Sequence, residues 1–180
     1  MNAKRFRKLL DRLDRRPSAL FRRILLQTMM RTTAKAFEMP PERLFFRAPD
    51  HALQLYADYT VSCMEHAAAD PERIYDMSYE LGERIRRWCG PQDPQEMQRL
   101  VFLLYRSIGI TMRGELADHI EVPACFFSRI YTPEQCRIMS CMDSGIVSGI
   151  CGGGRLIFTA RLTEGCDRCI ACLERKENDE

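Results

Sequence analysis

Three segments of the chain carry the same signal for the start of a helix. A side chain that can cap a helix stands directly before a proline at Asp70-Pro71, Asp93-Pro94 and Thr132-Pro133, with acidic or amide side chains in the turn that follows. Aspartate and threonine accept hydrogen bonds from the free backbone N–H groups of a first helical turn, and proline suits the first helical position because it has no N–H group to leave unpaired. The sequence therefore predicts helices from residues 71, 94 and 133.

Apolar residues at helical spacing predict the other helices. Two faces can be followed along the chain: Leu53, Tyr56, Ala57, Thr60, Met64 and Ala67, and then Ile74, Met77, Leu81, Ile85 and Trp88. Residues 19–37 form a further helix after the break at Pro17, and residues 38–51 are a connector with one helical turn at 41–45. Residues 97–110 are apolar on nearly every side, which predicts the central buried helix.

The pattern changes after Gly114. Residues 119–127 look extended, and the helix from Pro133 runs to about Cys151, where three glycines end it. Residues 155–163 alternate between polar and apolar side chains, the period of a half-buried strand. The fold class that follows is α+β: a helical N-terminal two thirds and a small C-terminal sheet packed on a glycine- and serine-rich helix.

A chain of 180 residues is long enough for one domain and short for two. We divide it into a basic helical extension (1–37), a helical region (38–118) and a cysteine-rich α+β unit (119–173). Residues 4–13 read as a basic amphipathic helix that packs on its own domain or on a second subunit, so a homodimer through the N-terminal helices is expected; an anionic membrane or nucleic acid is the alternative. The net charge of +2 gives no reason to expect nucleic acid.

The chain has nine cysteines, and no secretory signal or long apolar run accompanies them. This combination indicates a reducing, cytoplasmic setting without a transmembrane segment, in which thiols stay free or bind metal. Seven of them lie in the last third of the chain: Cys125, Cys136, Cys141, Cys151, Cys166, Cys169 and Cys172. Such clustering is hard to attribute to random core filling.

Three cysteines stand at CxxCxxC spacing in "TEGCDRCIACLE" (163–174). With Cys141 as a fourth ligand, Cys166, Cys169 and Cys172 would complete a tetrahedral zinc site; Cys125 or Cys151 would serve equally as the fourth. An iron–sulfur cluster is less expected, because the proline and fourth cysteine of a ferredoxin-type run are missing. Inert buried thiols, or one reactive thiolate beside Arg161 or Arg168, are the other interpretations.

The helix that begins at Pro133 carries a stripe of small residues with an acid among them. Ser140, Cys141, Ser144, Gly145, Ser148, Gly149 and Gly152 recur at spacings of three and four. A small stripe lets a helix approach a sheet or another helix closely. Asp143 stands in this stripe, and a carboxylate at a packed surface needs a partner. It is either a structural carboxylate, paired for example with Arg155 or Arg161, or a general acid/base beside a thiol.

The segments "ACFFSRIY" (124–131), "MSCMDSGIVSG" (139–149) and "LIFTARLTEGCDRC" (156–169) resemble the C-terminal pattern of the L-2-amino-thiazoline-4-carboxylic acid hydrolase-like family. The corresponding positions are Cys125, Asp143, Gly165, Asp167 and Cys169. The extra thiols Cys166 and Cys172 depart from that pattern and fit a metal site better. A more distant similarity is to the 4-vinyl reductase-type domain, a small-molecule-binding module.

The first resemblance implies hydrolysis of a C–N bond in a small cyclic amidine such as a 2-amino-thiazoline carboxylate. Cys125 or Cys169 would then be the thiolate or a metal ligand, and Asp143 the acid/base. Arg161 would hold a substrate carboxylate, with Thr163 beside it in the substrate site. The alternative function is a non-catalytic, cysteine-rich module that binds a small ligand or zinc.

Overall fold

The computed structural model describes Asp11, residues 18–44 and residues 48–174. In that part of the chain the long helices are α2 (Ala19–Ala36), α3 (Pro49–His66), α4 (Pro71–Cys89), α5 (Pro94–Ser107) and α6 (Pro133–Cys151). The strands are β1 (Ile110–Glu115), β2 (His119–Cys125), β3 (Arg155–Ala160) and β4 (Cys169–Glu174), and the 3₁₀ turns are η1 (Phe126–Arg129) and η2 (Leu162–Glu164). The fold is α+β, with the helices first and the sheet near the C-terminus, as expected.

The three capping signals set the starts of α4, α5 and α6. The Asp70 carboxylate accepts hydrogen bonds from the backbone of Glu72 and Arg73, and Asp93 accepts one from Glu96. Thr132 and Gln135 form a reciprocal capping box at the start of α6. Each of these helices begins at its proline because the preceding side chain supplies the hydrogen bonds that the first turn lacks.

The sheet is antiparallel throughout, in the order β1-β2-β4-β3. A hairpin joins β1 to β2, while β4 inserts between β2 and β3 after α6 has crossed the sheet. Along β4, Cys169, Ala171 and Leu173 are buried and Ile170 and Cys172 are only partly covered. One face of the sheet is therefore packed on the helices, and the other is more open.

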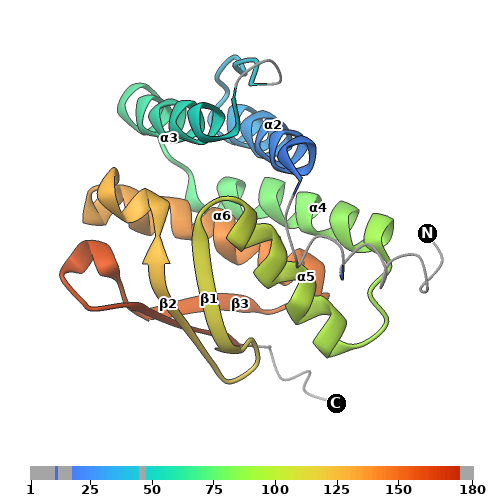
Figure 1. Ribbon diagram of the computed structural model, residues 1–180. Helices are drawn as coiled ribbons and strands as arrows, with labels where there is room; N and C mark the ends of the chain where they lie inside the picture. Colours follow the sequence, from blue (N-terminus) through green and yellow to red (C-terminus); the bar gives the residue numbers. More distant parts are fainter. Residues whose placement is uncertain (1–10, 12–17, 45–47, 175–180) are drawn as a thin grey trace.

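Figure 1 shows three tiers: the pair α2 and α3, then α4, α5 and α6, then the sheet. Helix α6 lies in the middle tier and packs on α4, on α5 and on β3. A single group of buried apolar residues runs through all three tiers, from Leu25 in α2 to Leu173 in β4. The cavity described below lies where the upper tier meets the lower two.

Gly145 and Gly149 of the small stripe of α6 face α4. A Cβ atom on Gly145 would lie 2.7 Å from the Cβ atom of Ser78, and one on Gly149 would lie 2.8 Å from the backbone nitrogen of Glu83. Gly82 of α4 meets Gly149 in the same way, with 2.9 Å to its Cα atom. The two helix backbones are thus in direct contact, which explains why α6 accepts interior glycines at a cost of about 1 kcal/mol each in helix propensity.

Some sequence-based expectations were wrong. Helix α5 ends at Ser107 and β1 begins at Ile110, so the segment 97–110 is not one helix, and the most enclosed helix is α6. Of the connector expected at 38–51, residues 38–44 and 48–51 are described; they contain no helical turn at 41–44, and residues 49–51 already belong to α3. Of the apolar face predicted for α4, Ile74 and Leu81 are buried but Trp88 is 65% exposed, because the buried side of this helix runs through Ser78, Gly82 and Cys89 as well.

The boundary placed between residues 118 and 119 falls inside the β1–β2 hairpin, so the sheet begins within the segment expected to be helical. The basic helix expected at 4–13 lies outside the described residues, apart from Asp11. Within the described residues, no helix has the length and apolar character needed to cross a membrane.

Candidate functional site

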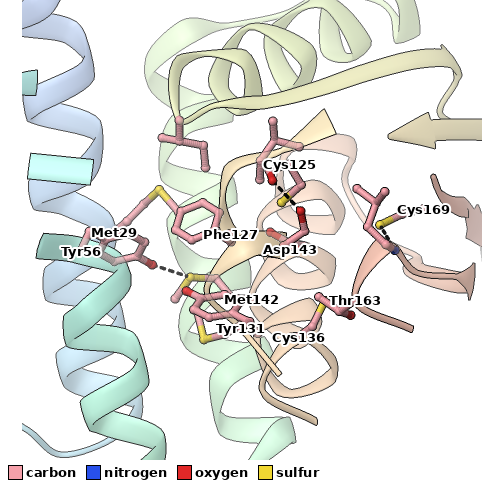
Figure 2. Close-up of a pocket in the computed structure, with 15 residues that line it drawn as sticks. Met29, Tyr56, Cys125, Phe127, Tyr131, Cys136, Met142, Asp143, Thr163 and Cys169 are labelled. Atoms are coloured by element: carbon pink, nitrogen blue, oxygen red, sulfur yellow. Dashed lines mark hydrogen bonds between the residues drawn. The ribbon is translucent and has the colours of Figure 1, made fainter. Parts of the chain in front are cut away.

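A cavity of about 50 Å³ lies between the upper helix pair and the lower tiers (Figure 2). Its walls come from α2, α3, α6, η1, η2 and the ends of β1, β2 and β4. The apolar lining residues are Met29, Tyr56, Ile108, Ile110, Phe127, Tyr131, Met139, Met142 and Leu162. The polar or titratable ones are Cys125, Ser128, Cys136, Asp143, Thr163 and Cys169. An apolar cavity with a few converging polar groups is the usual form of a small-molecule site.

Aromatic rings build the wall formed by η1. The Phe127 ring stacks on Tyr131 with 5.4 Å between centroids and meets the edge of Tyr56 at 6.1 Å. The Tyr131 hydroxyl hydrogen bonds to Thr60, and the Tyr56 hydroxyl lies 3.2 Å from the sulfur of Met142. These contacts fix η1 against α3 and α6, so this wall is built before any ligand enters.

Asp143 is the acidic group of the cavity. The Tyr105 hydroxyl of α5 donates a hydrogen bond of 3.0 Å to the Asp143 Oδ1 atom. Burial raises the pKa of Asp143 from 3.8 to about 6, although the Tyr105 hydrogen bond and the charge of Arg161 act to lower it. The carboxyl group can therefore gain or lose a proton near neutral pH.

Tyr105 is a part of the site that sequence analysis did not identify. It lies in the apolar run of α5, and burial together with the charge of Asp143 holds its own pKa well above the ordinary value of 10.0. It is thus a neutral donor throughout the physiological range. The available signal was a tyrosine inside an otherwise apolar helix, because a buried hydroxyl needs a partner.

The three thiols of the cavity are protonated at neutral pH. Burial, with the charge of Asp143 as the next cause, raises the pKa of Cys125 to about 12. Burial also raises the pKa of Cys136 and of Cys169, whose sulfur accepts a hydrogen bond of 3.3 Å from the Leu162 backbone. None of the three has the lowered pKa that marks a nucleophilic thiolate.

Thr163 extends into the cavity from η2 and lies next to Cys136 (Figure 2). Its Oγ1 atom is buried and forms no well-aligned hydrogen bond, although its contact with the Cys136 thiol acts to lower the pKa of that thiol. A buried hydroxyl without a partner is uncommon in folded proteins, and such groups often mark the place of a ligand or an ordered water. Thr163 thus offers a second polar contact in the cavity, in addition to Asp143.

The expected zinc ligands do not come together. Cys166 is exposed in the turn before β4, while Cys169 and Cys172 fall on opposite faces of that strand. Cys141 lies on α6 outside the cavity. Among the described residues, no group of three or more histidine, cysteine, aspartate or glutamate side chains could hold a metal ion. The CxxCxxC spacing does not produce converging sulfurs here, because residues three apart in a strand face opposite ways.

A second hollow, of about 160 Å³, opens on the neighbouring side of α6. It is lined by Pro71, Glu72, Tyr75, Arg137, Ser140, Cys141, Ser144, Arg155, Leu156, Ile157 and Arg161. Arg161 belongs to this hollow and is not among the residues that line the Asp143 cavity. Of the predicted site residues, the structure therefore brings together Cys125, Asp143, Thr163 and Cys169, and separates Arg161 and Cys141 from them.

Comparison of the chain with family models, with curated proteins and with solved structures finds no match. The function proposed next therefore rests first on the geometry of the site.

Proposed function

We propose that the cavity binds a small, mostly apolar molecule that carries a basic nitrogen, and that Asp143 recognises that nitrogen. The observation that carries this proposal is one carboxyl group, with a pKa of about 6, in an otherwise apolar cavity with an aromatic wall. At pH 7 and above the carboxylate is mostly ionised and has only Tyr105 as a hydrogen-bond donor within the described residues. A cationic ligand would supply the missing countercharge.

A cyclic amidine meets these requirements. Its planar, protonated N–C–N group can donate two hydrogen bonds to one carboxylate, and its ring presents apolar faces to Phe127 and Met142. The Thr163 hydroxyl would be left to contact a ring heteroatom. This is the ligand class that the resemblance to thiazoline hydrolases implies.

Binding is tested by calorimetry with 2-amino-2-thiazoline, and with 2-methyl-2-thiazoline as a probe of similar shape that lacks the amidine. We expect the amidine to bind more tightly, and its affinity to fall as the pH drops below about 6, because Asp143 becomes protonated. Asp143→Asn should lose the preference for the amidine, whereas Asp76→Asn, an exposed residue of α4, should retain it. Equal affinity of Asp143→Asn and the wild-type protein for both probes would refute the proposal.

Hydrolysis of the bound amidine is the second candidate function, favoured by a carboxyl group that exchanges protons near neutral pH. Asp143 would take a proton from water as its oxygen bonds to the amidine carbon. It would return that proton to the ring nitrogen as the C–N bond breaks, so the product contains the substrate plus one water. The high pKa of Cys125 argues for water rather than a thiolate as the nucleophile.

Mass spectrometry of the incubated amidine separates the two candidates. Hydrolysis predicts a product heavier by one water, formed by the wild-type protein and by Cys125→Ser but not by Asp143→Asn. Loss of the product in Cys125→Ser, with binding retained, would instead identify a thiol nucleophile. Binding without any product would support the non-catalytic ligand-binding function.

A further inference from the structure

The second hollow contains an arginine, Arg161, that forms no ion pair with any described residue around it. Arg161 is half-buried, and its Nε atom is buried without a hydrogen-bond partner. Its guanidinium carbon lies 5.0 Å from the centre of the Phe158 ring. Within the described residues it has no carboxylate at ion-pair distance, and Asp143, across α6, acts on it only over a longer range.

The other two arginines of the hollow are already engaged. Arg155 forms two hydrogen bonds, of 3.1 and 2.6 Å, with the Glu72 carboxylate and stacks on the ring of Tyr75. Arg137 donates one of 2.9 Å to Glu164. Each of these cations thus has a carboxylate partner of its own, and the guanidinium of Arg161 is the one left to be paired.

A second donor lies in the same hollow. The Ser144 hydroxyl oxygen accepts a hydrogen bond of 2.9 Å from the Leu156 backbone, which leaves the hydroxyl hydrogen free to be donated. Ser144 lies on α6 and Arg161 directly follows β3, and both line the hollow. Buried donors of this kind need an acceptor, and a guanidinium group is suited to bind the two oxygens of one carboxylate.

We propose that this hollow is a binding site for the carboxylate group of a small monocarboxylic acid, with Arg161 as its anchor. A single available guanidinium group balances one negative charge, so a carboxylate fits better than a phosphate, which carries about −1.5 to −2 at neutral pH. The neighbouring arginines are each offset by a carboxylate, Glu72 or Glu164, so the charge of Arg161 is the one left uncompensated in the hollow. The site is separate from the Asp143 cavity and does not depend on the ligand proposed there.

The test is an NMR titration of the ¹⁵N-labelled full-length protein, with sodium acetate replacing sodium chloride at constant ionic strength. We expect saturable shifts of the amide signals of residues 155–157 and 161. Arg161→Gln should weaken acetate binding at least tenfold. Arg161→Lys should weaken it less, because lysine keeps the positive charge but cannot donate the bidentate pair of hydrogen bonds. Arg168→Gln, a nearby exposed arginine paired with Glu121, should bind acetate as the wild type does.

Three results would overturn the inference: no saturable shift in the wild-type protein, equal acetate affinity in Arg161→Gln, or phosphate binding that is as tight as acetate binding. Thermal unfolding of each variant establishes that the fold is intact, and Arg161→Lys provides the comparison if Arg161→Gln does not fold. Asp143→Asn should leave acetate binding in place, so failure of the amidine proposal and failure of this one can be told apart.

Discussion

The Tyr105 hydroxyl, from α5, donates its hydrogen to the Asp143 carboxylate, from α6, across 3.0 Å at the edge of an apolar cavity. This single bond joins two helices and offsets part of the cost of burying the charge. It does not offset all of it, because burial still raises the pKa of Asp143 to about 6. An ionised carboxylate that is buried in this way lowers the stability of the folded protein. We therefore assign Asp143 a role in binding.

Replacing Asp143 with asparagine should stabilise the protein at neutral pH. The folded pKa of about 6 lies above the ordinary 3.8, so the folded state holds the proton more tightly and stability falls as the pH rises through that window. Two pKa units correspond to roughly 3 kcal/mol. Asparagine avoids this loss and can still accept the Tyr105 hydrogen bond.

Urea unfolding at several pH values measures the effect. Between pH 4 and pH 6 the wild-type free energy of unfolding should fall relative to that of Asp143→Asn, to a difference of roughly 1–3 kcal/mol above pH 6. Asp76→Asn should follow the wild type. If Asp143→Asn were less stable than the wild type at pH 7, the carboxylate would have a structural role in stabilising the fold and would not need a role in binding.

Removing the Tyr105 hydroxyl should raise the pKa of Asp143 further. The hydrogen bond favours the ionised carboxyl group, so Tyr105→Phe should move the pKa upward by roughly one unit. The measurement is a ¹³C NMR titration of the aspartate carboxyl signals. Tyr79→Phe is the matched control, because its ring stacks on Tyr75 in α4, away from the cavity. An unchanged or lower pKa in Tyr105→Phe would show that the hydroxyl is not the donor in solution.

Local signals in the sequence were enough to locate the starts of α4, α5 and α6. Each of these starts depends on a capping side chain directly before a proline, and α6 ends where expected because Gly152 adopts the left-handed conformation that closes a helix. The strand β3 also follows from its own alternation. These features need no information from distant parts of the chain.

What the sequence did not reveal depends on contacts between distant segments. β4 pairs with β2 and β3, and its two cysteines, with Cys166 just before it, suggested a metal site rather than a strand. β1 is short and pairs only with the segment that follows it, so its first residue was attributed to the preceding helix. Asp143 could be singled out as a carboxylate among small residues, but its partner Tyr105 is 38 residues earlier in the chain.

Alanine at Gly145 should destabilise the protein even though it favours a helix. The added Cβ atom would overlap the backbone of α4 near Tyr75 and lie 2.9 Å from the backbone nitrogen of Tyr79. The backbone atoms of Tyr75 and Tyr79 cannot move without shifting α4. We therefore expect the free energy of unfolding, measured by chemical denaturation, to fall by about 1–3 kcal/mol. In a peptide of residues 132–152 the same change should increase helicity. Equal stability of the variant and the wild type would mean that α4 and α6 pack less closely in solution.

Thiol reactivity should be dominated by Cys166. Of the nine cysteines, all of them in the described part of the chain, Cys166 alone is exposed, whereas Cys125 and Cys169 line the cavity. With a pKa of about 12, Cys125 is ionised in roughly one molecule in ten thousand at pH 8. The native protein should therefore show one fast reaction with an aromatic disulfide reagent.

Cys166→Ser should remove that fast reaction and leave the slow ones, and unfolding in guanidinium chloride should make the remaining cysteines react together. Cys172→Ser is the matched control, because Cys172 is partly covered on the open face of the sheet and should not account for the fast reaction. A fast thiol that persists in Cys166→Ser and disappears in Cys125→Ser would place an activated cysteine beside Asp143. It would then favour a covalent mechanism over attack by water.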